Sequence, residues 1–148
     1  MKQVVIDFDA ATHPVGIMEA FMKMALLKEG KSNVAFNWNC LFLGRKNAVK
    51  LCFKKIFEGC DVFTYLHYCK QFCSERLPQL VKPSVEKEIV QAIRNETPVF
   101  VKFNGIGEVI APYLQSFGKI DIQCTYRADI KRTNILTGKW VSSGCSIS

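Results

Sequence analysis

The chain has 148 residues, of which 49% are hydrophobic and 22% are charged. This composition is typical of one globular domain, or one core with an insert, and excludes a disordered segment. The formal net charge of +7 gives some affinity for anions. The sequence has no Lys/Arg block with interleaved aromatic residues, so we expect no nucleic-acid partner. The excess of basic residues includes a group at helical spacing, which favours a solvated helix face: Arg45, Lys46, Lys50, Lys54 and Lys55.

The cysteines and the N-terminus predict a reduced, cytoplasmic protein. There are 7 cysteines, without a C-x-x-C pair and without the features of a signal peptide before them. Cys69 and Cys73 lie one helical turn apart near His67, as two zinc ligands could. No second ligand pair stands at metal spacing, so we favour buried thiols in the core. No apolar run reaches the roughly 18 residues that a membrane helix needs, and we expect no membrane partner.

The first strand carries the strongest functional signal. Residues 2–6 form a basic and apolar run that predicts a buried strand, and Asp7-Phe8-Asp9 follows at its carboxyl end. Two carboxylates one residue apart are costly there unless they bind a cation or take part in chemistry. Ligands bind at this end of the strands in open α/β sheets. The alternative is a strand-end turn in which an Asp side chain caps the next backbone amides.

Residues 13–80 are predicted to be mostly helical. Pro14 suits a first helical turn, and apolar residues recur at helical spacing from residue 15 to residue 26. A second helix is expected to begin within 34–43, and a third apolar stripe runs from 45 to 57. Asp61 is a candidate N-cap for a helix that ends near Arg76.

The second half of the sequence alternates between helices and strands. Ser84 is a candidate N-cap, Asn104-Gly105-Ile106-Gly107 is expected to be a strand-to-helix turn, and Gly118 ends the following helix. Strands that alternate with helices predict an α/β fold with a parallel sheet. The expected elements are a helix over 85–94, a strand over 98–103, a helix over 108–117, a strand over 120–126, and a hairpin of 127–130 with 135–141 around Thr133-Asn134.

This order of elements resembles the haloacid dehalogenase (HAD) superfamily, in its phosphoserine-phosphatase-like branch. Asp7-Phe8-Asp9 matches the opening of the first family motif, and the segments Cys73–Pro83 and Ile120–Trp140 are similar to later parts of the family core. The resemblance implies a Rossmann-like three-layer core, with a parallel sheet and a β-hairpin near the C-terminus. The core would comprise residues 1–12 and 83–148, and a helical cap, residues 13–82, would be inserted after the first strand.

The resemblance also implies a chemistry, namely hydrolysis of a small phosphorylated molecule through an aspartyl phosphate. Asp7 would be the nucleophile, and Asp9 would protonate the leaving group and then activate water. Mg²⁺ would be held by Asp7 and the backbone carbonyl of Asp9 with a further acid. Asn104 and Gly105 would bind the phosphoryl group, because an Asn amide and glycine amides at a helix N-terminus can hold an anion.

Three departures from the family pattern leave two functions open. Ala10-Ala11-Thr12 has one residue more than the first motif, and Lys102-Phe103-Asn104 stands where the second motif has Ser or Thr. The sequence also stops near where the family lysine and its last acidic motif would follow, so the core is expected to be incomplete. The first function is an Mg²⁺-dependent phosphatase of weak or absent activity, with Lys102 or Asn104 replacing a lost group. The second is a truncated, non-catalytic protein that binds a partner, with a homo-oligomer favoured by its bare apolar surface.

Overall fold

A computed structural model describes residues 3–9, 16–28, 45–142 and 146–147. The expectations for the spacing at Ala10–Thr12 and for a helix within 34–43 lie outside these residues. The described elements are β1 (Val4–Asp7), α1 (Ile17–Lys28), α2 (Arg45–Phe57), α3 (Val62–Glu75), α4 (Leu77–Leu80), α5 (Pro83–Arg94), β2 (Val99–Ile106), the 3₁₀ turn η3 (Gly107–Val109), α6 (Ala111–Gln115), β3 (Asp121–Ile130), β4 (Leu136–Ser142) and β5 (Ser146–Ile147).

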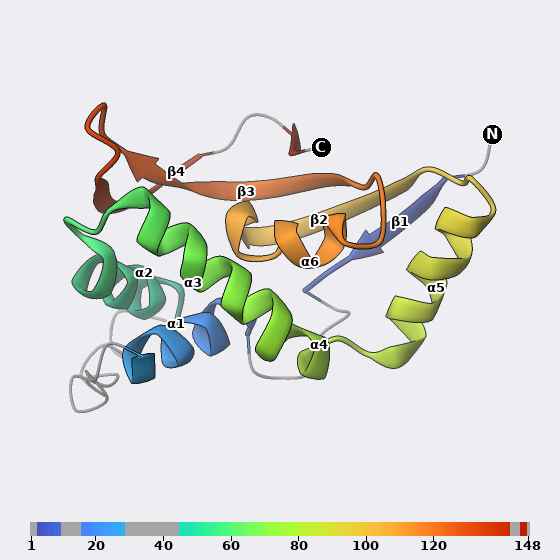
Figure 1. The fold of residues 1–148 in the computed structure, drawn as a ribbon, viewed down its shortest axis with the longest axis horizontal. Helices are drawn as coiled ribbons and strands as arrows, with labels where there is room; N and C mark the ends of the chain where they lie inside the picture. The colour runs from blue at the N-terminus through green and yellow to red at the C-terminus, as the bar shows by residue number, and fades with distance from the viewer. Residues whose placement is uncertain (1–2, 10–15, 29–44, 143–145, 148) are drawn as a thin grey trace.

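The described strands form one open, mostly parallel sheet, which confirms the predicted α/β class. β1, β2 and β3 lie side by side in that order and run parallel, while β4 and β5 pair antiparallel with β3 on its other side. The hairpin between β3 and β4 is confirmed as well (Figure 1). Asn134 has φ 63° in its turn, so it adopts the left-handed conformation for which glycine is otherwise used.

The helices cover one face of this sheet. In β2 the side chains of Val99, Val101 and Phe103 are buried, whereas Lys102 between Val101 and Phe103 is exposed. Right-handed crossovers that step in one direction through a sheet place their helices on one face, and β1, β2 and β3 follow each other in that way. The described residues therefore form two layers, and the expected third layer is not among them (Figure 1).

The uncovered face changes the character of β1, which was predicted to be a buried strand. Ile6 is buried on the helix side, but Val5 on the opposite face is 48% exposed. Within the described residues β1 pairs with β2 and with no other strand. β1 is thus an edge strand with one buried face.

The helices expected to form the cap share one core with the sheet. The ring of Phe21 stacks on that of Phe57 at 5.7 Å between centroids, and the Phe21 ring meets that of Phe72 edge-on at 5.6 Å, which joins α1, α2 and α3. Phe53 of α2 meets Trp140 of β4 edge-on at 5.9 Å. A single cluster of buried residues contains side chains from α1, α2, α3 and the strands β1 to β3.

Three elements differ from the sequence predictions. The helix expected to start after Ser84 starts at Pro83, with Lys82 at the N-cap position, because proline suits the first helical position. β2 continues through Ile106, so the predicted strand-to-helix turn at 104–107 was wrong. The predicted helix over 108–117 is instead the 3₁₀ turn η3 followed by α6, because Pro112 has no N–H to donate to the preceding turn.

The structure also bears on the remaining sequence predictions for the helices. Asp61 is the N-cap of α3, although its side chain makes no capping hydrogen bond. Cys69 and Cys73 are buried in α3, as the core-thiol interpretation predicts, while His67 beside them is exposed. None of the described helices has the length and apolar character that crossing a membrane requires.

Candidate functional site

The two predicted acids lie where β1 ends, on either side of a buried ring. The backbone N–H of Phe8 donates to the carbonyl of Lys102 at 2.9 Å, which extends the parallel ladder by one residue beyond β1. The Phe8 side chain is fully buried against the rings of Phe103 and Tyr113. Because Phe8 is anchored inside, the side chains of Asp7 and Asp9 are both left exposed at the carboxyl end of the strand.

Hydrogen bonds tie the turn to the neighbouring strand. The Asp9 carboxylate accepts the backbone N–H of Asn104 at 2.8 Å, across 95 positions of sequence. The Asp7 carboxylate accepts the backbone N–H of Asp9 at 3.2 Å. The first contact brings together Asp9 and Asn104, two of the residues that the sequence predicted for one site.

The Asp9 carboxyl group has a perturbed affinity for protons. Its partial burial raises the pKa of Asp9, the hydrogen bond from the Asn104 N–H opposes this shift, and the negative charge of Asp7 adds to it. Two carboxylates that repel each other at one strand end are stabilised by a divalent cation or by a shared proton. The pair therefore suits either metal binding or proton transfer.

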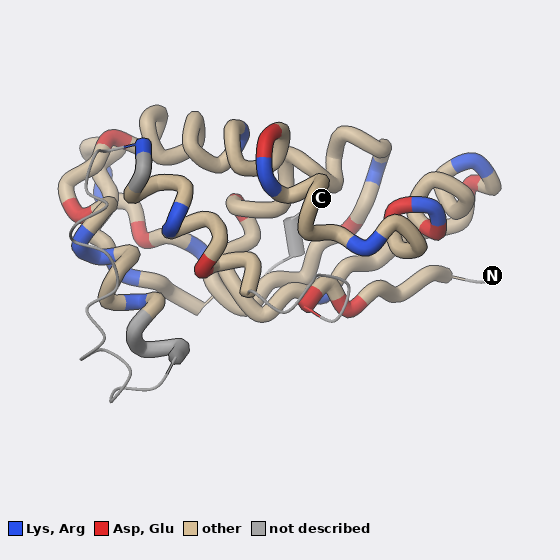
Figure 2. The backbone as a smooth tube through the Cα atoms, turned by 90° about the horizontal axis from the view of Figure 1, so that it is seen from below, with Lys and Arg blue, Asp and Glu red and all other residues tan. Residues whose placement is uncertain are grey.

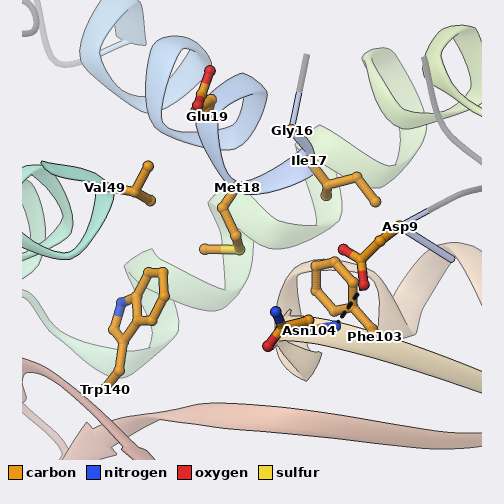
Figure 3. Close-up of a pocket in the computed structure, with 9 residues that line it drawn as sticks. All are labelled: Asp9, Gly16, Ile17, Met18, Glu19, Val49, Phe103, Asn104 and Trp140. Carbon is orange, nitrogen blue, oxygen red and sulfur yellow. Dashed lines mark hydrogen bonds between the residues drawn. The ribbon is translucent and has the colours of Figure 1, made fainter. Parts of the chain in front are cut away.

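A cavity of about 280 Å³ opens beside Asp9, between the helices and the carboxyl end of β2 (Figure 3), and Asp7 is not among the described residues that line it. Asp9 and Asn104 stand at one end of it, with Phe103 beside them, and Met18 and Val49 project toward it from α1 and α2. Trp140 of β4 lies at the far end (Figure 3). The cavity is thus polar at the strand ends and mostly apolar elsewhere. The described residues that line it are Asp9, Gly16, Ile17, Met18, Glu19, Val49, Phe103, Asn104 and Trp140.

Trp140 is held in place by three neighbours. Its ring meets that of Phe53 edge-on at 5.9 Å and lies 5.4 Å from the ring of Tyr126. The Lys50 ammonium group lies over the ring of Tyr126, 4.7 Å from its centroid, and over the ring of Trp140, 5.7 Å from its centroid. Lys50 is therefore engaged in a cation–π contact, which corrects its assignment to a solvated face, whereas Lys54 and Lys55 are exposed as predicted. The indole wall of the cavity is consequently preorganised.

Gly105 does not line the cavity, in contrast to Asn104. It lies within β2 and is buried, and a Cβ atom there would stand 2.6 Å from the Phe103 ring and 3.2 Å from Met18 Cγ. The absence of a side chain at Gly105 lets Phe103 and Met18 pack closely over the strand. Its position gives it a packing role beneath the cavity.

Lys102 lies next to Asp7 on the uncovered face of the sheet. The two residues are paired in the register between β1 and β2, and both side chains are exposed. Residues paired in this way point to the same face from neighbouring strands about 5 Å apart. The lysine is thus placed to put a positive charge near Asp7.

The acid pair meets the minimum requirement for magnesium. No group of three or more His, Cys, Asp or Glu side chains able to hold a metal occurs among the described residues. Mg²⁺ is commonly bound by one or two carboxylates, with waters and substrate phosphates completing its shell. Asp7 and Asp9 offer two carboxylates at one strand end, so a magnesium ion bound here would take most of its oxygens from waters, backbone carbonyls or a ligand.

Sequence analysis did not identify the apolar wall of this site. Val49 and Trp140 lie more than 90 positions apart in the sequence and meet the cavity because α2 packs against β4. The indication in the sequence is Trp140 itself, in a hairpin strand that returns along the carboxyl half of β3.

In the comparisons with known proteins, no family model matches this chain, and no curated protein matches it either.

Proposed function

We propose that this chain is a HAD-like phosphatase that hydrolyses a small phosphomonoester with Mg²⁺. The observation that carries the proposal is the hydrogen bond from the Asn104 N–H to the Asp9 carboxylate. It holds an acid pair and an amide side chain at the carboxyl ends of adjacent parallel strands, beside a cavity. Ligands of open α/β sheets bind at this end of the strands.

The two acids differ in a way that suits two roles. Asp7 is exposed at the end of β1, where its carboxylate can attack phosphorus and form an aspartyl phosphate. Asp9 has a raised pKa, so it can give a proton to the oxygen of the leaving group as the P–O bond breaks. It can then take a proton from the water that attacks the phosphorus of the aspartyl phosphate, which releases inorganic phosphate and restores Asp7.

Positive charge at the site would come from two sources. Mg²⁺ held by the Asp7 carboxylate and the backbone carbonyl of Asp9 would neutralise charge on the phosphoryl oxygens, which leaves the Asp9 carboxyl group available for proton transfer. Lys102, the register partner of Asp7 on β2, supplies a positive charge on the other strand, and the Asn104 amide offers an N–H donor from the cavity side. Lys102 and Asn104 are therefore the residues that would replace the lost motif groups.

The test is Mg²⁺-dependent hydrolysis of p-nitrophenyl phosphate and an alkyl phosphate. Asp7→Asn is expected to abolish turnover of both, and Asp121→Asn, which removes an acid at the opposite end of the sheet, is the matched control. Asp9→Asn should slow the alkyl phosphate far more than p-nitrophenyl phosphate, because nitrophenolate leaves with little protonation. Folded protein without Mg²⁺-dependent turnover, or equal turnover by Asp7→Asn, contradicts the phosphatase proposal.

A second candidate function, self-association, is favoured by the edge of β1 that pairs with no other strand in the described part of the chain. The N–H groups of Val4 and Phe8 donate to carbonyls on the β2 side, so the backbone groups of Val5 face away from β2. Two copies of the chain could pair their β1 strands antiparallel, with the two Val5 residues opposite each other. The backbone N–H and C=O of each Val5 would then bond to those of the other Val5. The pairing would also cover the two Val5 side chains, each of which is 48% exposed. This arrangement provides an interaction role for the chain without catalysis.

Sedimentation equilibrium tests this second function. Val5→Lys should convert a dimer into a monomer, while Phe63→Lys, which changes a residue 71% exposed on α3, should leave the dimer intact. A wild-type chain that is monomeric at high micromolar concentration contradicts the self-association candidate.

A further inference from the structure

We infer that the cavity beside Asp9 receives a single aromatic ring, so that the substrate of the proposed phosphatase is a small aryl or arylalkyl phosphomonoester. This inference rests on the proposed function for the phosphoryl end of the ligand. It concerns the organic group, which the acid pair alone does not identify.

The size of the cavity limits the ligand. Its volume is about 280 Å³, close to the lower end of the range for small-molecule pockets. A dry cavity of roughly 150 Å³ is enough for benzene in another protein. The space therefore accommodates one ring with a phosphoryl group attached.

The lining of the cavity indicates what kind of group it takes. Met18, Val49 and Trp140 are its apolar side chains away from the acid pair, and Phe103 lies nearer the strand ends (Figure 3). A thioether and an indole are favourable neighbours for an aromatic ring. A short hydroxylated chain such as that of a phosphorylated serine would leave these apolar surfaces in contact with water.

The rigidity of the wall strengthens the argument. The rings of Phe53 and Tyr126 and the ammonium group of Lys50 surround the indole of Trp140. An indole fixed before the ligand arrives loses little conformational entropy on binding. The polar groups Asp9 and Asn104 lie at the strand ends, and Glu19 of α1 adds a further carboxylate to the lining (Figure 3). The match to a ligand with one polar end and one ring therefore depends on the apolar side chains of Met18, Val49 and Trp140.

Calorimetric binding of non-hydrolysable phosphonates tests the inference. Phenylphosphonate and methylphosphonate share the head group and differ in the ring, and each is titrated with and without Mg²⁺. In Mg²⁺ we expect phenylphosphonate to bind at least about tenfold more tightly, because the ring leaves water. Benzyl alcohol, which has a ring but no phosphoryl group, serves as the third ligand.

Val49→Phe fills the cavity and should reduce the preference for phenylphosphonate to near unity. Thr97→Phe is the matched control, because it adds the same ring at a different cavity of about 400 Å³ at the amino ends of the strands. If Val49→Phe does not fold, Met18→Ala enlarges the cavity instead and should shift the preference from phenylphosphonate toward a naphthyl phosphonate.

The outcomes separate the two proposals. Equal affinity for the two phosphonates, each dependent on Mg²⁺, overturns the aryl inference and leaves the phosphatase proposal standing. Binding of benzyl alcohol as tight as phenylphosphonate, with no effect of Mg²⁺, contradicts the phosphatase proposal and with it the assignment of a phosphoryl ligand. A preference for the ring that persists in Val49→Phe also overturns the inference, because the ring would then bind elsewhere.

Discussion

Glu108 offers a quantitative test of the packing behind the site. One of its carboxylate oxygens accepts the backbone N–H of Ala128 at 3.1 Å, and the other is buried without a hydrogen-bond partner among the described residues. Burial raises the pKa of Glu108, opposed by the N–H donors of Glu108 itself and Ala128 and by the charge of Arg127. We therefore predict that Glu108→Gln is more stable than wild type at neutral pH.

The sign and size of the stability difference between Glu108→Gln and the wild type follow from proton linkage. Because the pKa of Glu108 in the folded state is raised above its ordinary value, the folded state keeps a proton at pH values where the unfolded chain has lost it, and unfolding at these pH values releases that proton. Below the pKa that Glu108 has in the unfolded chain, the free energy of unfolding of the wild type is unaffected by this group. It falls as pH rises, and the loss is complete above the pKa that Glu108 has in the folded state. Each pH unit between the two pKa values corresponds to about 1.4 kcal/mol. For a domain of this size, that is a change in Tm of about 3–5 °C.

Thermal unfolding of the wild type and of Glu108→Gln between pH 4 and pH 8 measures the difference directly. The two Tm values should converge near the unfolded pKa and diverge as pH rises, with the variant higher. Glu88→Gln is the control, because Glu88 is exposed on α5 and should give a curve parallel to the wild type. Parallel curves for Glu108→Gln as well, or a variant less stable at pH 8, would refute the argument.

Three further predictions test separate contacts. Gly105→Ala should lower the free energy of unfolding by about 1–3 kcal/mol, because its Cβ would stand 2.6 Å from the buried Phe103 ring, and unchanged urea unfolding would contradict this packing. Asn134→Val should cost about 1–2 kcal/mol at φ 63°, whereas Asn134→Gly should be near neutral by the same measurement. Burial raises the pKa of Cys73 to about 12, so iodoacetamide at pH 8 should leave this thiol unlabelled in folded protein, and rapid labelling seen by mass spectrometry would show that it is accessible.

The strands could be predicted because their local patterns and their environment agree. Residues 98–103 and 120–126 were expected to be strands and lie in β2 and β3, although both strands continue further than predicted. The error at 104–107 has a physical cause. Two glycines at alternate positions indicate a turn by composition, but Gly105 stays in the strand and lets Phe103 and Met18 close over it. That contact depends on tertiary packing, which local propensity does not contain.

The polar half of the site could be predicted and the apolar half could not. Asp7 ends β1, Asp9 follows it, and Asn104 lies near the carboxyl end of β2, so a parallel sheet brings them to one edge. The position of Trp140 beside Val49 depends on how α2 packs on β4. No periodicity in either segment encodes that packing, and the same holds for Lys50, whose cation–π contact joins α2 to β3 and β4.

The direction of the chain through the sheet explains the shape of the site. In doubly wound folds the binding crevice opens where successive connections leave a central strand in opposite directions. The described parallel strands step in one direction only, from β1 to β2 to β3, so this kind of crevice is not formed among them. The walls of the cavity come instead from α1, α2 and β4. Selectivity for the organic group should therefore depend on Met18, Val49 and Trp140, whereas no described strand pairs with the edge of β1 on the far side of Asp7. A second chain paired there would change access to Asp7 without altering the cavity.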